Sequence, residues 1–213
     1  MNTPAPISLG LFGSSHISRY PLHLFHKYNI QPKVISSSPK NIAAIERENT
    51  VHQSIQHIQS HNIKLDMILI LIGANDIGTL HPQQIINGII KIADTFNNIN
   101  ILPIIVPILN RESPRNISKA LYKTHRNRIN KHLRLHYKNQ HIHNIIQTPN
   151  LHLEKDGVHL AKHGYNTLTK AIAFHIKKRN IPTHITQLPP EHYTNHHTRE
   201  EIIVTIITET NQS

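Results

Sequence analysis

Short apolar runs alternate with longer amphipathic stretches along most of the chain. The apolar runs predict five β-strands, at 7–12, 33–36, 66–73, 99–109 and 142–147. The stretches between and after them predict helices, at 16–27, 41–62, 82–96, 117–137 and 161–178. A break is expected in the first helix, at Pro21. We therefore expect an α/β fold, a three-layer α/β/α sandwich with a five-stranded parallel, flavodoxin-like sheet of strand order 2-1-3-4-5.

The 213 residues suffice for one such domain, which we place at 1–178. A chain of this length buries roughly 70% of the surface that its unfolded form exposes. The stretch 179–200 is polar and contains prolines, which is typical of a linker. The EIIVTIITET stretch after it is rich in β-branched residues and could form a strand. We therefore expect a polar linker and a β-prone tail over 179–213.

Composition narrows the class of protein. The absence of cysteine excludes disulfides and thiolate metal sites, and it is compatible with a cytoplasmic or nuclear protein. We attribute the twenty histidines to a skewed composition. Since none stands out as a helical pair with an acidic neighbour, we predict no metal site. No apolar run approaches the roughly 18 residues of a membrane span. We therefore predict an intracellular protein without a transmembrane segment.

Three polar stretches follow predicted strands, at the edge where open parallel sheets bind ligands. FGSSH follows the first strand, IGANDIG the third and LEKDGVHL the fifth. They contain four of the seven glycines, which in a glycine-poor chain are expected where the backbone needs them. Each stretch also contains side chains that can take part in catalysis. These are, in order, a serine, an asparagine, and an aspartate three residues before a histidine.

Together these stretches resemble the sequence blocks of the SGNH, or GDSL-type, hydrolase superfamily. Gly13-Ser14-Ser15 matches the first block, with Ser15 at the nucleophile position and Ser14 where aspartate is usual. GAND, from Gly73, matches the third block, and DGVH, from Asp156, matches the fifth. The resemblance covers nearly the whole predicted domain. GSSHISR and YKTHRNRINKHL are also similar to the SGNH domains of eukaryotic retroelements, which suggests a mobile-element or viral origin.

The resemblance implies an ester hydrolase of esterase, lipase or acetylesterase type with a catalytic triad. A serine hydroxyl becomes a nucleophile when a base takes its proton, and an imidazole that titrates near neutrality suits that task. Ser15 would be the nucleophile and His159 the base, with Asp156 accepting the other ring N–H. The expected substrate is a small-molecule, lipid or carbohydrate ester. No metal or organic cofactor is implied.

The same resemblance implies three donors for an oxyanion hole. They are the Ser15 backbone N–H, the Asn75 side-chain amide and a backbone N–H of the second block, which we assign to Ser38. The family's second block usually contains a glycine, whereas this chain has VISSSPKN there. Loss of one such donor typically costs about 10²–10³ in rate, so weak activity is expected. Gly73 and Asp76 are expected to support the Asn75 loop.

Each assignment has a structural alternative. Ser15 could be the N-cap of the first helix, and Asn75 an ordinary turn residue. His159 could be one more product of a histidine-rich composition. Ser14 is expected to cap the helix in place of the usual aspartate. All three blocks occur in order and after predicted strands, which favours the catalytic interpretation.

A second hypothesis comes from the formal net charge of +11. Nine Lys or Arg residues fall within 111–138, against one acidic residue. A helix this basic could lie along a phosphate backbone, which would make the chain an RNA- or DNA-binding accessory domain with a vestigial hydrolase site. The alternative is a solvated helix face. The candidate nucleic-acid contacts are Arg115, Lys119, Lys123, Arg126 and Lys131.

Overall fold

The computed structural model describes residues 4–37, 41–47, 49–139, 145–148 and 150–178. The strands are β1 (Ile7–Gly13), β2 (Ile30–Ser36), β3 (Met67–Leu71) and β4 (Leu102–Ile105). The α-helices are α1 (Ser15–Ser18), α2 (Ile42–Arg47), α3 (Thr50–Ser60), α4 (Pro82–Asn97), α5 (Lys119–Asn139) and α6 (Lys162–Lys178). A 3₁₀-helix, η1 (Leu22–Tyr28), follows α1.

The strands form a parallel sheet of order β2-β1-β3-β4. Leu9 of β1 pairs with Pro32 of β2 on one side and with Met67 of β3 on the other. Met67 in turn pairs with Leu102 of β4. The predicted α/β class and the predicted order of these strands are confirmed.

The prediction of five strands is wrong for the described part of the chain, where the sheet has four. In the segment 142–147, Ile145 forms a single parallel bridge with Ile105, and the Ile146 N–H donates to the Ile105 carbonyl at 3.0 Å. The positions 142–144 lie outside the described residues. Ile145 thus lies beside β4, at the outer edge of the sheet.

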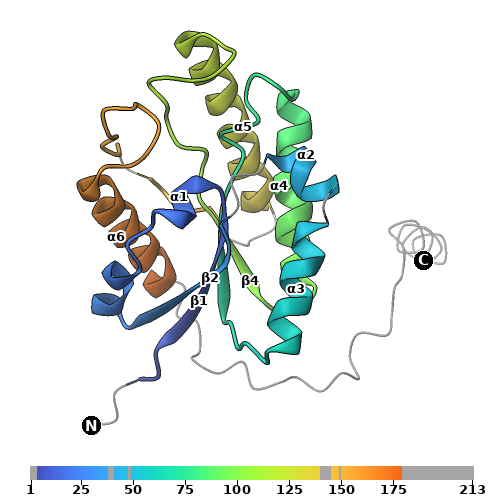
Figure 1. Ribbon diagram of the computed structural model, residues 1–213, viewed down its shortest axis with the longest axis vertical. Coiled ribbons are helices and arrows are strands. Elements are labelled where there is room, and N and C mark those ends of the chain that lie inside the picture. The colour runs from blue at the N-terminus through green and yellow to red at the C-terminus, as the bar shows by residue number, and fades with distance from the viewer. Residues whose placement is uncertain (1–3, 38–40, 48, 140–144, 149, 179–213) are drawn as a thin grey trace, which may run out of the picture. The chain divides into compact units, whose positions relative to one another are not determined.

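Helices cover both faces of the sheet (Figure 1). The sheet separates two hydrophobic cores. Successive side chains of a strand point to opposite faces. Ile68 and Ile70 of β3 therefore lie in the core under α2, α3, α4 and α5, whereas Met67 and Leu69 lie in the core under α1, η1 and α6. Burial on both faces explains the unbroken apolar run of β3. The predicted three-layer arrangement is confirmed.

Two predicted helices are each divided in the structure. The helix expected at 41–62 consists of α2 and α3, with Asn49 at φ 52° as the N-cap residue of α3. Asparagine enters this left-handed region more readily than most residues. The helix expected at 16–27 consists of α1 and η1, and Pro21 precedes η1, as the expected break requires.

The described residues all belong to one unit, which spans Met1–Thr183. The predicted linker and β-prone tail at 179–213 lie outside the described residues. Among the described helices, none combines the length and the apolar character that crossing a bilayer requires. Because the strands are parallel, their carboxyl ends lie at one edge of the sheet, at the top of Figure 1.

Candidate active site

Ser15, His159 and Asp156 form a hydrogen-bonded chain at the carboxyl edge of the sheet. The Ser15 Oγ lies 3.2 Å from the His159 Nε2, and the His159 Nδ1 lies 2.6 Å from the Asp156 Oδ2. Ser15 begins α1 directly after β1, whereas the other two residues lie in the loop before α6. The sheet thus brings the three predicted triad residues together. In this geometry an imidazole can take the serine proton while the carboxylate holds the other ring N–H.

Asp156 is fixed by its own loop. Its Oδ1 accepts the backbone N–H groups of Val158 at 2.8 Å and of His159 at 2.9 Å, which leaves Oδ2 to the imidazole. The hydrogen bond from the His159 ring, together with these two N–H groups, holds the pKa of the Asp156 carboxyl well below its usual range. Asp156 is therefore a carboxylate at neutral pH, so the His159 Nδ1 donates to it. The His159 Nε2 is then the acceptor for the Ser15 hydroxyl.

Gly157 lets this loop pack against the segment that follows β4. Its φ is +66°, and a Cβ at this position would lie 2.8 Å from the Ser113 Oγ and 2.9 Å from the Glu112 Cβ. The Gly157 carbonyl accepts the Glu112 N–H at 2.7 Å. Another residue here would be strained by both its backbone conformation and this close approach.

His16, directly after the candidate nucleophile, holds the loop of Asp156 from the other side. Its Nε2 donates to the Val158 carbonyl at 3.2 Å, and its ring centroid lies 5.5 Å from that of His159. Burial lowers the pKa of His16 to about 4, so the ring is neutral at neutral pH. The Tyr165 hydroxyl donates to the His16 carbonyl at 3.3 Å. His16 was not predicted, because among twenty histidines its only signal is its place beside Ser15.

Ser14, not Ser15, occupies the N-cap position of α1, so the N-cap alternative for Ser15 is wrong. The Ser14 carbonyl accepts the Ile17 N–H at 2.8 Å. The expected cap by the Ser14 side chain is also wrong, because its buried hydroxyl makes no capping hydrogen bond. Ser15 is the first helical residue, and an N–H at that position has no acceptor within its helix. The Ser15 N–H is therefore available to an oxyanion.

Asn75 is half-buried in the turn after β3, and its Oδ1 accepts a hydrogen bond from the Arg111 Nη2 at 2.5 Å. Because the amide oxygen has this partner, the amide nitrogen is the group that can donate to a substrate. Arg111 was not predicted as a site residue, since it is one of nine cations in its segment. Ser38, the predicted third donor, lies outside the described residues.

Asp76 connects the Asn75 turn to α2. Its side chain is fully buried, and its Oδ1 accepts the Ile42 N–H at 2.7 Å. Burial raises the pKa of Asp76 to about 6, against the opposing effects of the Ile42 N–H and the Arg111 charge. The Asp76 N–H donates to the Gly73 carbonyl at 3.2 Å, which closes the turn around Asn75. Gly73 and Asp76 thus lie where loop support was expected.

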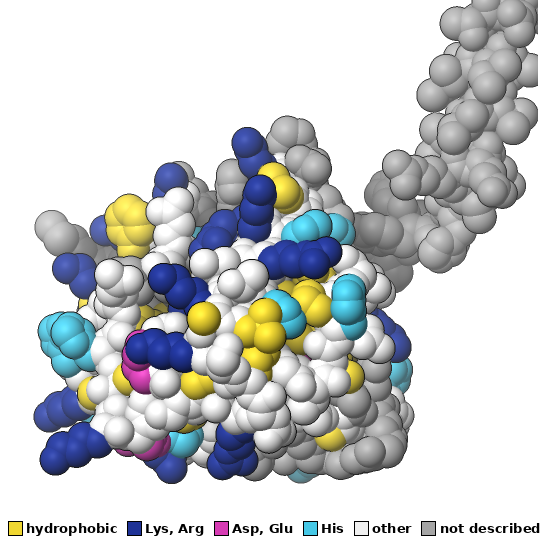
Figure 2. Space-filling model, turned by 90° about the horizontal axis from the view of Figure 1, so that it is seen from above, with side chains coloured by type: hydrophobic (Ala, Val, Ile, Leu, Met, Phe, Trp, Pro, Cys, Tyr) yellow, Lys and Arg dark blue, Asp and Glu magenta, His cyan; other side chains and the backbone are white. Residues whose placement is uncertain are grey.

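The five candidate nucleic-acid contacts lie in α5 and the segment before it. Arg126 is half-buried and the other four are exposed. Two already have protein partners, since Lys119 pairs with Glu112 and Arg126 donates to the Asn110 Oδ1 at 2.8 Å. Figure 2 looks onto the top of the molecule in Figure 1 and shows Lys and Arg spread over this face, where Asp and Glu are sparse. Such a face attracts anions in general. Nucleic-acid binding through these residues stays a prediction.

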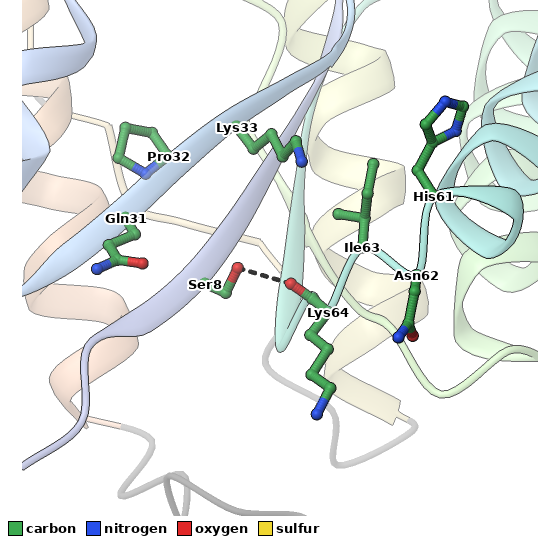
Figure 3. Close-up of a pocket in the computed structure, with 8 residues that line it drawn as sticks. All are labelled: Ser8, Gln31, Pro32, Lys33, His61, Asn62, Ile63 and Lys64. Atoms are coloured by element: carbon green, nitrogen blue, oxygen red, sulfur yellow. Dashed lines mark hydrogen bonds between the residues drawn. The ribbon is translucent and has the colours of Figure 1, made fainter.

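A pocket of about 410 Å³ lies at the opposite edge, by the amino ends of the strands (Figure 3). Its lining residues are Ser8, Gln31, Pro32, Lys33, His61, Asn62, Ile63 and Lys64. The Ser8 Oγ donates to the Lys64 carbonyl at 2.8 Å rather than to an imidazole. This pocket therefore offers no activated nucleophile. In the described part of the chain, no group of three or more His, Cys, Asp or Glu side chains is arranged to hold a metal ion.

The fold is that of the SGNH, or GDSL, hydrolases, and this agrees with the resemblance seen in the sequence. The agreement comes from solved structures alone, because no family model matches the sequence and no curated protein matches it. At the identities found, these structures establish the fold.

Three solved structures illustrate the likeness. A protein from Bacteroides fragilis NCTC 9343, provisionally described as an acylhydrolase, has a TM-score of 0.63 and 15% identity, over 83% of this chain and 91% of that one. A GDSL-like lipase from Bacteroides thetaiotaomicron VPI-5482 has a TM-score of 0.60 and 15% identity, over 81% of this chain and 88% of the lipase. The psychrotrophic esterase EstA from Pseudoalteromonas sp., inhibited by monoethylphosphonate, has a TM-score of 0.51 and 14% identity, over 81% of this chain and 97% of the esterase.

Proposed function

We propose that this chain is a serine hydrolase that cleaves a carboxylic ester through an acyl-enzyme on Ser15. The observation that carries the proposal is the hydrogen-bonded chain from Ser15 through His159 to Asp156, with distances of 3.2 and 2.6 Å. The fold shared with GDSL lipases and esterases supports the same reaction class. The substrate is a small-molecule, lipid or carbohydrate ester, and the reaction uses no cofactor.

In the acylation step, the Ser15 Oγ attacks the ester carbonyl carbon while the His159 Nε2 takes the hydroxyl proton. The π electrons of the carbonyl move to its oxygen, and the Asp156 carboxylate stabilises the imidazolium that forms. The Ser15 N–H and the Asn75 amide donate to the oxyanion. When the intermediate collapses, the bond to the alcohol oxygen breaks and that oxygen takes the proton from His159.

In the deacylation step, a water molecule replaces the alcohol. The His159 Nε2 takes one water proton as the water oxygen attacks the acyl carbon. The bond to the Ser15 Oγ then breaks, and the Ser15 Oγ recovers the proton from His159. The carboxylic acid is released and the resting triad is restored. If the glycine-free second block supplies no third donor, the reaction should be slower by about 10²–10³.

Hydrolysis of p-nitrophenyl acetate by matched variants tests the proposal. Surface imidazoles also react with activated esters, so Ser15→Ala measures the background of this histidine-rich chain. Ser15→Ala and His159→Ala should each remove all hydrolysis above that background. Asp156→Asn should cost less than His159→Ala, because the imidazole remains. Ser14→Ala should cost about tenfold or less, as expected for a supporting contact. Hydrolysis by Ser15→Ala at the unmodified rate would refute the proposal.

A further inference from the structure

Arg111 is a buried cation with no ion pair to a carboxylate in the described part of the chain. Its side chain is 6% exposed, and its Nε has no hydrogen-bond partner. Burial lowers the pKa of Arg111, which reflects the cost of its charge in this place. The negative charges of Asp76 and Asp156 offset part of this cost, although neither carboxylate forms an ion pair with the guanidinium in the described part of the chain. The Arg111 Nη2 instead donates to the Asn75 Oδ1 of the candidate active site at 2.5 Å, which indicates a functional task.

The backbone holds Arg111 at a fixed place between α5 and the loop of Asp156. On one side, the Ile108 N–H donates to the Asn130 Oδ1 at 2.8 Å, and the Asn130 Nδ2 donates back to the Ile108 carbonyl at 3.0 Å. On the other side, the Glu112 N–H donates to the Gly157 carbonyl at 2.7 Å. The chain is therefore hydrogen-bonded on both sides of Arg111, at Ile108 to α5 and at Glu112 to the loop of Asp156.

We propose that Arg111 is a positioning residue that holds the Asn75 carboxamide so that its NH₂ group faces the developing oxyanion. The inference rests on the proposed ester hydrolysis. A carboxamide can turn by half a rotation and present its oxygen, which would repel an oxyanion. A guanidinium only donates, so the contact at 2.5 Å from the Arg111 Nη2 binds the Asn75 oxygen and fixes the orientation. The charge of Arg111 also strengthens this hydrogen bond.

Kinetics of four variants test this assignment. Arg111→Met removes the donors and the charge at similar length and should lower kcat by about 10- to 100-fold, with KM within about threefold. Arg111→Lys keeps one donor and should recover part of the loss. Because Arg111 acts through Asn75, Arg111→Met combined with Asn75→Ala should be no slower than Asn75→Ala alone, within about threefold. The melting temperature of each variant is measured alongside, so that kcat is compared per folded molecule.

A second measurement does not depend on activity. The side-chain NH₂ signals of Asn75 in a ¹⁵N–¹H spectrum, assigned by their loss in Asn75→Ala, should shift in Arg111→Met and stay closer to their original place in Arg111→Lys. Unchanged Asn75 signals in Arg111→Met would overturn the inference, as would additive losses in the double variant. If the unmodified protein lacks hydrolysis above the Ser15→Ala background, the proposed function fails, while the Asn75 signals still decide whether Arg111 orients the amide.

Discussion

Two buried side chains beside the candidate active site, His16 and Asp76, make the stability of the fold depend on pH. The pKa of His16 is about 4 when folded against 6.5 as the ordinary value, so between these values the unfolded chain binds a proton that the folded chain does not. The free energy of unfolding therefore has its full value, as far as His16 is concerned, above pH 6.5, and it decreases as the pH falls to about 4. Asp76 has the opposite effect on stability. Because its pKa is raised to about 6, the folded chain binds a proton before the unfolded chain does, and this contribution increases the free energy of unfolding as the pH falls below about 6.

His16→Gln should remove the His16 share of this acid sensitivity. A glutamine amide can donate to the Val158 carbonyl without titrating. The shift from 6.5 to about 4 corresponds to ~3 kcal/mol. Between about pH 7 and pH 4, the unmodified protein should therefore lose up to ~3 kcal/mol more of its free energy of unfolding than the variant does. Urea unfolding at several pH values measures this, with Asp76 unchanged in both proteins. Equal losses would show that His16 titrates normally.

Gly157→Ala should lower both stability and activity. A left-handed backbone costs about 1–2 kcal/mol for other residues, and the added Cβ would push against Ser113 and Glu112, which moves the loop that holds Asp156. Asn29→Ala is the matched control, since Asn29 also has a positive φ, of 58°, but lies before β2 at the other edge of the sheet. Both variants should unfold more easily in urea. Only Gly157→Ala should hydrolyse esters more slowly per folded molecule, and an equal rate for the two would refute the role of Gly157.

At this scale, the residues of the proposed triad and the loop residues Gly73 and Asp76 could be predicted from the sequence, whereas His16 and Arg111 could not. The three-residue spacing of Asp156 and His159 is a weak signal in a chain with twenty histidines, and the order of all three blocks after predicted strands was needed to select them. His16 and Arg111 gain their roles from contacts across 142 and 36 positions, which no local pattern encodes. The abundance of histidine and of basic residues hides them further.

At the scale of elements, the basic helix α5 poses the clearest question. At about 100° per residue, Lys119, Lys123 and Arg126 share one face of the helix, and Lys131 lies roughly a third of a turn away. Because Lys119 and Arg126 have protein partners, Lys123 and Lys131 are the exposed positions to change.

If α5 binds nucleic acid, affinity for single-stranded RNA should fall steeply between about 50 and 200 mM salt, through release of counterions. Lys123→Glu combined with Lys131→Glu should make the slope of log affinity against log salt concentration shallower, by the contribution of about two phosphate contacts. Reversing Lys33 and Lys64, at the opposite edge of the sheet, changes the net charge equally and should leave the slope unchanged. Fluorescence anisotropy measures both. A slope that is insensitive to the α5 changes would favour a solvated helix face.

Elements with a strong hydrophobic period were predicted well, and so was the break at Pro21, but the break at Asn49 and the pairing at Ile145 were not. β3 is buried on both faces, so its apolar run had one interpretation. Asn49 interrupts a helical period through its backbone conformation, which the apolar spacing does not reveal. Ile145 forms a single bridge beyond β4, and its predicted partners in the segment, 142–144, lie outside the described residues.

At the scale of the whole molecule, the sheet and α6 fix the two halves of the proposed triad relative to each other. The Ser14 N–H donates to the Leu71 carbonyl at 3.1 Å, which ties the nucleophile turn to β3. From α6, the Tyr165 hydroxyl reaches the His16 carbonyl, and the Thr169 hydroxyl lies 3.0 Å from that of Tyr20. The candidate site therefore depends on the central packing of the domain. A cytoplasmic or nuclear location stays a prediction.

The most direct test of the central claim is to label the protein with a fluorophosphonate and map the adduct by peptide mass spectrometry. The reagent reports an activated serine whatever the natural ester is, since it phosphonylates the attacking oxygen. A single adduct on Ser15, absent in Ser15→Ala and retained in Ser14→Ala, is the predicted result. An adduct on another residue, undiminished labelling of Ser15→Ala, or no labelling of the folded unmodified protein would contradict the account.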